Sequence, residues 1–355
     1  MLPRVPHFLP MVTFSSALFA FVGVATADDA QPKRMPAVRS VAGNLDNPSG
    51  VAIHPETGHI FVAEHRGVLR LSPQTEEGKK GMARTFEVRK YPSDIYGKGP
   101  MYDIGPLGVA FLNGEHLIVA DGSRPDAEEL VRIYEIAATP PEKSQAEDAA
   151  TYTLGPIKPG DASEKGEGNF YGIAVTNQAI HITSNGDDTK GWILRSQLEG
   201  DKPGELQPFI ATKQDVEVDA PCGITVNADG DLVVGQMGEI SVLGDSLLLV
   251  YDAKTGKLKQ QYKTGLSDIT GLAYSPATGR LYATDFAWAD TKQGGLFELT
   301  IENGACTTRK VLELDKPTAI TFDNKGHAFV TVFGTAEEGA KGKPGKLIRV
   351  PKPLL

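Results

Sequence analysis

The stretch that decides the fold is PSGVAIHPETGHIFVAE, residues 48–64, because its pattern returns five more times along the chain. In each copy a short apolar run introduced by a small residue is followed by a polar turn and a second apolar run. The other copies are PLGVAFLNGEHLIVAD (106–121), FYGIAVTNQAIHITSN (170–185), PCGITVNADGDLVVGQ (221–236), ITGLAYSPATGRLYATD (269–285) and PTAITFDNKGHAFVTV (317–332). The interval from the opening small residue to the last residue is always 13 or 14 positions. Such regular repetition predicts an array of similar β-units.

Each copy is followed by further strand-like runs. After the first copy these are Gly67–Leu71 and Arg84–Val88, and after the fifth they are Gly295–Thr300 and Thr307–Glu313. Four short antiparallel strands, repeated at intervals of about 50 residues, are typical of a propeller blade. The sequence therefore predicts an all-β protein, a six-bladed β-propeller with four antiparallel strands in each blade.

The sixth copy indicates how the ring closes. The chain ends after Gly345–Val350, so the last blade lacks a fourth strand, whereas Ala37–Ala42 is a spare β-like run before the first copy. We expect this N-terminal strand to complete the last blade, because that pairing removes an open sheet edge.

The first 27 residues have the features of a targeting segment. Met11–Val24 carries no charge, and Ala25-Thr26-Ala27 follows it as a small-x-small cleavage site. This pattern predicts a signal peptide over 1–27 and an exported propeller over 28–355, periplasmic or extracellular. The alternative is an uncleaved anchor, but the apolar run is shorter than the about 20 residues of a membrane span. No later stretch is long and apolar enough for a transmembrane segment.

Composition excludes several classes of protein. Lys and Arg number 36 against 45 Asp and Glu, a net charge of −9, which disfavours a nucleic-acid partner. The 39 glycines and 24 prolines indicate many turns. Only Cys222 and Cys306 are present, too few for a disulfide-rich scaffold. We expect these two cysteines to lie on opposite faces of the propeller and to remain unpaired.

The repeated phrases also carry a family resemblance. Pro-x-Gly-Val-Ala, a polar turn, and then Ile-Phe-Val-Ala-Glu or Leu-Ile-Val-Ala-Asp resemble the NHL repeat and the wider SMP-30/gluconolactonase group of six-bladed propellers. The resemblance covers nearly all of the mature chain. It implies the fold but leaves the function open, because this fold hosts hydrolases, lyases and binding modules.

Loop lengths indicate which face carries function. The turns inside the first hairpin of each blade are short, whereas the opposite face carries long segments such as Lys90–Pro106, Gly155–Phe170 and Phe286–Gly294. That opposite face holds the crossovers between blades, and we call it the crossover face. Because long loops on a rigid scaffold usually carry function, we expect the site there.

Polar side chains end five of the six second strands on this face: Glu64, Asp121, Asn185, Gln236 and Asp285. One interpretation is that Glu64, Asp121, Asn185 and Asp285 form a ring of oxygen ligands around a Ca²⁺ ion. The alternative is that they cap their own turns through backbone N–H groups.

The resemblance to SMP-30-type lactonases bears on the metal hypothesis. It implies a metal-ligating Asp at the position of Asp121 and Asp285, and a ligand Asn before the small residue that opens an inner strand. None of the six residues at that second position is Asn; they are Ser49, Leu107, Tyr171, Cys222, Thr270 and Thr318.

Five residues of the crossover face are candidates for catalysis or for contact with a ligand. Asp285 and His65 are the catalytic candidates, with His65 as a general base. No Ser, Cys or second His has a spacing that ties it to His65. Trp288 and Phe286 are candidate ligand contacts, since a Trp flanked by acids can stack on a sugar ring; the alternative is a Trp packed against a neighbouring blade. Tyr171 is a further candidate contact.

Two functions follow from these observations. The first is a secreted or periplasmic recognition platform that binds a small molecule, glycan or peptide at the channel mouth. The alternative is a Ca²⁺-dependent lactonase or esterase of the SMP-30/gluconolactonase type, in which the cation polarises a carbonyl oxygen.

Overall fold

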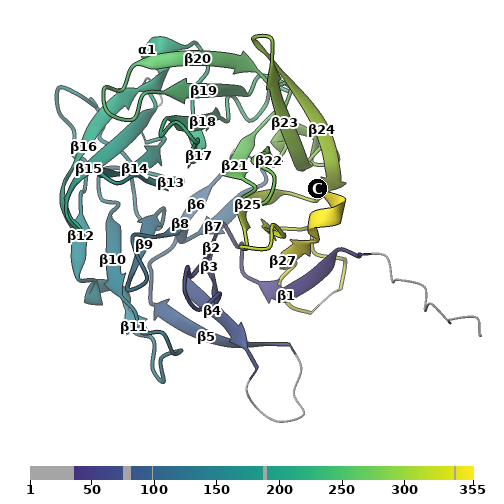
Figure 1. The fold of residues 1–355 in the computed structure, drawn as a ribbon. Helices are drawn as coiled ribbons and strands as arrows, with labels where there is room; N and C mark the ends of the chain where they lie inside the picture. Colours follow the sequence, from purple (N-terminus) through teal and green to yellow (C-terminus); the bar gives the residue numbers. More distant parts are fainter. Residues whose placement is uncertain (1–35, 75–80, 98, 187–189, 340) are drawn as a thin grey trace, which may run out of the picture. The chain divides into compact units, whose positions relative to one another are not determined.

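The computed structural model describes residues 36–74, 81–97, 99–186, 190–339 and 341–355. The predicted signal peptide lies outside these residues. The described chain forms six sheets, each with four antiparallel strands, arranged in a ring as a six-bladed β-propeller (Figure 1), which confirms the predicted fold. Within these ranges helix is almost absent: α1 (Thr212–Asp215) is one turn long, and the 3₁₀ turns are η1 (Glu147–Ala149), η2 (Trp288–Asp290) and η3 (Lys352–Leu354).

The blades follow the six sequence repeats in order, and in each blade the first strand of the repeat is the innermost. Blade one is β2 (Gly50–Ile53), β3 (Ile60–Glu64), β4 (Gly67–Pro73) and β5 (Met82–Arg89); blade two is β8 (Pro106–Phe111), β9 (His116–Asp121), β10 (Val131–Glu135) and β12 (Tyr152–Leu154); blade three is β13 (Ile173–Val175), β14 (Ala179–Ser184), β15 (Trp192–Glu199) and β16 (Lys202–Ala211). Blade four is β17 (Pro221–Val226), β18 (Leu232–Gln236), β19 (Leu247–Tyr251) and β20 (Leu258–Lys263); blade five is β21 (Ile269–Tyr274), β22 (Leu281–Asp285), β23 (Gly295–Glu302) and β24 (Ala305–Glu313).

Blade six is closed by the N-terminal strand, as predicted. Its strands are β25 (Pro317–Phe322), β26 (Ala328–Val332), β27 (Gly345–Val350) and, outermost, β1 (Arg39–Leu45). Strand β1 pairs antiparallel with β27, from Arg39 opposite Arg349 to Leu45 opposite Gly345. Figure 1 shows this purple strand beside the C-terminal strand of the chain.

A short hairpin and a short fifth strand were not expected from the repeats. Strands β6 (Asp94–Tyr96) and β7 (Tyr102–Ile104) pair with each other as a hairpin within the crossover from blade one to blade two. Strand β11 (Gln145–Ala146), in the loop before β12 of blade two, runs parallel to β5 and adds a fifth strand to the sheet of blade one.

The small residue that opens each repeat has a steric reason. A Cβ atom on Gly108 would lie 1.9 Å from the Tyr171 carbonyl oxygen, and one on Gly172 would lie 2.3 Å from the Cys222 carbonyl oxygen. Inner strands of neighbouring blades therefore approach closely around the axis, and at Gly108 and Gly172 the space admits only a glycine.

The hydrophobic core lies between neighbouring blades. One cluster joins Ile118 and Ile133 of blade two to Ile180 and Leu194 of blade three, all of them fully buried. Each blade buries both faces of its sheet in this way, which explains the apolar second strands of the repeat.

Two further predictions can be compared with the fold. Cys222 and Cys306 are free thiols, as expected. Across the described residues, no helix has both the length and the apolar character needed to cross a membrane.

Candidate functional site

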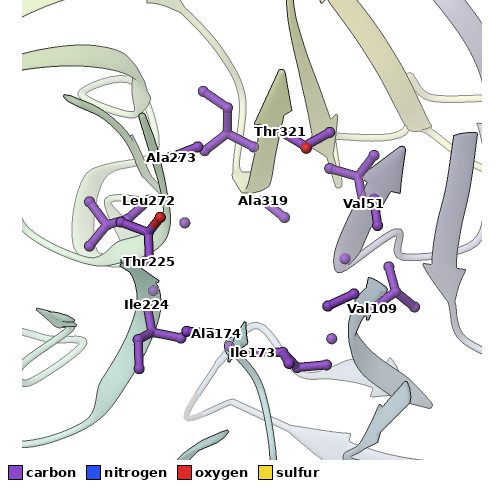
Figure 2. Close-up of a pocket in the computed structure, with 18 of the residues that line it drawn as sticks. Val51, Val109, Ile173, Ala174, Ile224, Thr225, Leu272, Ala273, Ala319 and Thr321 are labelled. Atoms are coloured by element: carbon purple, nitrogen blue, oxygen red, sulfur yellow. The ribbon is translucent and has the colours of Figure 1, made fainter. Parts of the chain in front are cut away.

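A channel runs along the axis of the ring. Its cavity has a volume of about 620 Å³ and is lined by the inner strands of all six blades. Figure 2 shows mainly apolar side chains around the hollow, among them Val51, Val109, Ile173, Ile224 and Leu272. Few of the labelled side chains can form a hydrogen bond with a polar ligand; those that can are Thr225 and Thr321.

Tyr171 lies across the crossover end of this channel. Its hydroxyl donates to the Thr318 carbonyl oxygen at 2.9 Å and lies 3.3 Å from the Ser49 carbonyl oxygen. The side chain lines both the channel and a second pocket at the mouth. Burial raises the pKa of the Tyr171 phenol, so the hydroxyl stays a donor. Tyr171, predicted as a ligand contact, thus separates the channel from the mouth.

The mouth pocket is aromatic. It has a volume of about 70 Å³, and Tyr96, Tyr102, Phe286, Trp288 and Phe333 are among its lining residues. The rings of Phe286 and Trp288 stack with centroids 4.7 Å apart, and Tyr102 packs edge-on against Trp288 at 5.5 Å and Phe333 at 5.2 Å. The structure therefore brings Trp288, Phe286 and Tyr171 to one pocket, and their contact with a ligand stays a prediction.

The β6–β7 hairpin lies near the centre of the ring (Figure 1), and its residues Tyr96 and Tyr102 line the mouth pocket. Its tyrosines Tyr96 and Tyr102 contact Trp288 of blade five. The approach is close, because a Cβ on Gly97 would lie 3.0 Å from the Trp288 ring. Trp288 consequently packs against a crossover that is far away in the sequence, and it does not project freely into solvent. Gly97, Gly99 and Pro100 between two tyrosine-containing runs are a turn signal that could have predicted this hairpin.

A polar cleft of about 410 Å³ adjoins the mouth pocket. The pocket and the cleft share Tyr96, Asn169, Asn185, Ala220 and Met237. The cleft adds four charged side chains, those of Asp126, Lys165, Asp219 and Glu239. The combined surface is therefore aromatic on one side and charged on the other.

Two buried polar atoms in the lining of the mouth have no partner. Asn185 Oδ1 and Trp288 Nε1 make no hydrogen bond in the described structure. Unpaired buried polar atoms are costly, so each such atom needs an explanation. A ligand that displaces the groups covering these two atoms and supplies one donor and one acceptor would pair both.

Asp285 caps the turns around it. Its Oδ1 accepts the backbone N–H groups of Asp268 at 2.7 Å and Ala287 at 3.1 Å, and its Oδ2 accepts that of Ser267 at 3.1 Å. Burial raises the pKa of this carboxyl, and the three N–H donors oppose the shift.

Asp121 and Glu64 also have protein partners. Asp121 accepts the Ser123 N–H at 2.8 Å and forms an ion pair with Arg124, while Glu64 Oε2 accepts the Asp46 N–H at 3.2 Å. Burial raises the pKa of both carboxyls. Gln236, the fifth polar residue at the end of a second strand, donates to the Val218 carbonyl oxygen at 3.2 Å.

The four predicted Ca²⁺ ligands do not fit one cation site in this arrangement. Among the described residues, no three His, Cys, Asp or Glu side chains gather closely enough to hold a metal ion. Asp121 and Asp285 would first have to release the donors that occupy both of their oxygens, whereas Asn185 has a free oxygen. Turn capping accounts for the acids, and the calcium site stays a prediction.

His65 has partners that the sequence did not reveal. Its Nδ1 lies 3.2 Å from Asp46 Oδ2, and its Nε2 lies 2.6 Å from the Ser93 hydroxyl oxygen. Sequence spacing ties no serine to His65, but the fold brings Ser93 to it. Ser93 belongs to the crossover before β6, and only the path of that loop brings it to the histidine.

One further acid beside the cleft is strongly perturbed. Burial, with added repulsion from Asp121 and Asp126, raises the pKa of Glu129 to about 10, although its Oε2 accepts the Asn169 N–H. Burial thus favours the neutral form of the Glu129 carboxyl, whose Oε2 holds the backbone of Asn169 at the edge of the mouth.

Comparisons with known proteins add the following. No protein-family model and no curated protein sequence matches the chain. Similar solved structures include a glucose dehydrogenase (14% identity, TM-score 0.58, covering 89% of this chain and 99% of the other) and the soluble aldose sugar dehydrogenase from Escherichia coli in its apo-form (12%, 0.57, 89% and 99%). Another is a putative gluconolactonase (12%, 0.53, 89% and 92%). At these identities the likeness shows the fold alone, and the NHL-repeat resemblance stays a prediction.

Proposed function

We propose that this protein is an enzyme that binds a small cyclic hydroxylated molecule, a sugar or sugar-derived lactone, at the channel mouth and hydrolyses a lactone or related ester on the crossover face. The observation that carries the proposal is the pair of unpartnered buried atoms, Trp288 Nε1 and Asn185 Oδ1, in the lining of an aromatic pocket. A hydroxylated ligand supplies both the acceptor and the donor that they lack.

The shape and polarity of the mouth support this ligand class. A pocket of about 70 Å³ is too small for a whole sugar, but it adjoins the cleft of about 410 Å³. The apolar C–H face of a sugar ring can pack against Trp288 and Tyr96, while its hydroxyls face the charged cleft.

The similar structures favour an enzyme over a recognition platform. The names of the three solved structures describe dehydrogenases of sugars and a lactonase. The main hypothesis from the sequence, a platform that only binds, is not confirmed, and the alternative of a hydrolase has the better support.

The test combines binding with turnover. Trp192 is the second tryptophan and lies in the core between blades two and three, so Trp192→Phe leaves Trp288 as the single fluorescent reporter. Titration with glucono-1,5-lactone, gluconate and glucose should quench this fluorescence saturably, and the lactone should release protons faster than in buffer alone.

Two variants test the role of the unpartnered Trp288 N–H. Trp288→Phe keeps an aromatic ring, smaller than the indole, but removes the N–H, and it should weaken binding about tenfold. Trp192→Phe is the matched control, with affinity equal to that of the wild type by calorimetry. Absence of saturable binding for all three compounds would refute the proposed ligand class, and binding without turnover would favour the platform.

A further inference from the structure

We propose that Ser93, His65 and Asp46 form a nucleophilic serine site that hydrolyses esters through an acyl-serine. The Ser93 hydroxyl oxygen lies 2.6 Å from His65 Nε2, and His65 Nδ1 lies 3.2 Å from Asp46 Oδ2. Nucleophile, base and orienting carboxylate are thus connected in the order that serine catalysis requires. This inference deepens the proposed function, on which the identity of the ester substrate rests.

The base and the carboxylate are fixed by the main chain. The His65 N–H donates to the Asp46 carbonyl oxygen at 2.9 Å, and the Asp46 N–H donates to Glu64 Oε2 at 3.2 Å. Asp46 follows β1 and His65 follows β3, so the strands of two blades set their positions. The imidazole is buried while the side chain of Asp46 is about one quarter exposed, at 26%.

The nucleophile is exposed but anchored. Ser93 is solvent-accessible on the loop between β5 and β6, whereas Tyr91, two residues earlier, is 1% exposed. The Tyr91 hydroxyl is hydrogen-bonded to the Tyr134 hydroxyl of blade two at 2.8 Å. The loop is therefore held at a buried aromatic side chain while the serine hydroxyl remains open to a substrate.

Charged and apolar groups beside Ser93 indicate the kind of ester. Arg66, the residue after His65, donates from Nη1 to the Tyr91 carbonyl oxygen at 3.3 Å, so a positive charge lies beside the loop that carries the hydroxyl. Such a charge would stabilise the oxyanion of a tetrahedral intermediate. Ile95, 57% exposed and two residues beyond Ser93, also lines the polar cleft and offers an apolar contact to a short acyl chain.

The reaction balances without a further reactant except water. His65 Nε2 takes the Ser93 proton while Oγ bonds to the ester carbonyl carbon. The C–O bond to the alcohol then breaks, and the alcohol leaves with the proton from Nε2. Water next gives a proton to Nε2 and adds to the acyl carbon; the bond to Oγ breaks, Oγ recovers the proton, and the carboxylic acid departs. Asp46 orients the ring and stabilises its charged form.

The experiment labels the purified protein with a fluorophosphonate probe and locates the adduct by peptide mass spectrometry. We expect one adduct, on Ser93, and a burst of p-nitrophenol from p-nitrophenyl acetate. Ser93→Ala should abolish both, and His65→Gln and Asp46→Asn should slow labelling on the order of 10³-fold or more. Ser40→Ala, which removes another exposed serine hydroxyl, is the matched control and should label at the wild-type rate.

Several results would overturn the site. These are no adduct on the wild type, an adduct on another residue, or an undiminished rate in Ser93→Ala. Because Ser93 is exposed, Ser93→Ala should retain the wild-type melting temperature and carries the test even where His65→Gln fails to fold. Lactone hydrolysis that persists in Ser93→Ala would support the proposed function and refute the serine site. Labelling of Ser93 without lactone binding would support the serine site and refute the proposed function.

Discussion

The Tyr171 hydroxyl donates to the Thr318 carbonyl oxygen at 2.9 Å, and this hydrogen bond joins the third blade to the sixth across the channel. The same hydroxyl lies 3.3 Å from the Ser49 carbonyl oxygen of the first blade. One side chain thus links three blades and forms the floor of the mouth pocket. The proposed ligand therefore meets a closed, aromatic floor instead of an open channel.

Removing this hydroxyl should loosen the ring. Tyr171→Phe leaves the carbonyl oxygens of Thr318 and Ser49 without this donor, so the free energy of unfolding should fall by about 1–2 kcal/mol. Urea unfolding followed by circular dichroism measures the change. Tyr262→Phe is the control, since Tyr262 is also buried but its hydroxyl has no hydrogen bond in the described structure. Equal losses in both variants would contradict a special role for Tyr171.

Asp285 separates the two interpretations of the second-strand acids. Asp285→Ala leaves the N–H groups of Ser267, Asp268 and Ala287 without their acceptor, so we expect a loss on the order of 3 kcal/mol in unfolding free energy. Asp285→Asn keeps one carbonyl-type acceptor and should lose less. Thermal unfolding in the presence of a chelator gives both values.

Calcium titration of the same proteins tests the metal hypothesis. If the acids only cap turns, the wild type should give no binding heat in calorimetry. Heat from the wild type that disappears in Asp285→Ala would instead support a Ca²⁺ site with Asp285 as a ligand.

His181 should make the fold sensitive to acid. Burial, and then the charge of Arg195, lowers the pKa of this imidazole from 6.5 to about 4. The unfolded chain takes up a proton near pH 6.5, whereas the folded chain does so only near pH 4. The contribution of neutral His181 to the free energy of unfolding is therefore complete above pH 6.5. It falls by up to about 3 kcal/mol as the pH decreases towards 4. His181→Leu should flatten stability between pH 7 and 5 in urea unfolding, and parallel curves for the two proteins would contradict this.

Glu129 should act in the opposite direction. Its pKa is raised to about 10, so the folded state retains a proton that the unfolded state releases near pH 4.5. Stability from this group is greatest at acid pH and is lost as the pH rises from about 4.5 to 10, by about 1.4 kcal/mol per pH unit. The neutral Glu129→Gln should therefore match the wild type at pH 5 and exceed its melting temperature at pH 9. A constant difference across this range would refute a neutral Glu129.

The proposed ester site illustrates how far the sequence reaches. His65 could be selected as a general base because it follows the second strand of the first repeat on the crossover face. Ser93 could not, because 28 positions separate it from His65 and no known serine motif surrounds it. The loop that delivers Ser93 is anchored by Tyr91 against Tyr134 in another blade, a contact that leaves no local pattern.

The sequence by itself determined the six blades, their order and the closure by β1, since each blade is specified by a local pattern of small, apolar and polar residues. Tertiary structure alone decided the mouth, because Tyr102, Trp288 and Phe333 come from separate loops and meet only after the ring has closed. The physical reason is the range of the interactions. Each first hairpin is encoded within a span of 13 or 14 positions, whereas the crossovers have no regular pattern and take their positions from long-range packing.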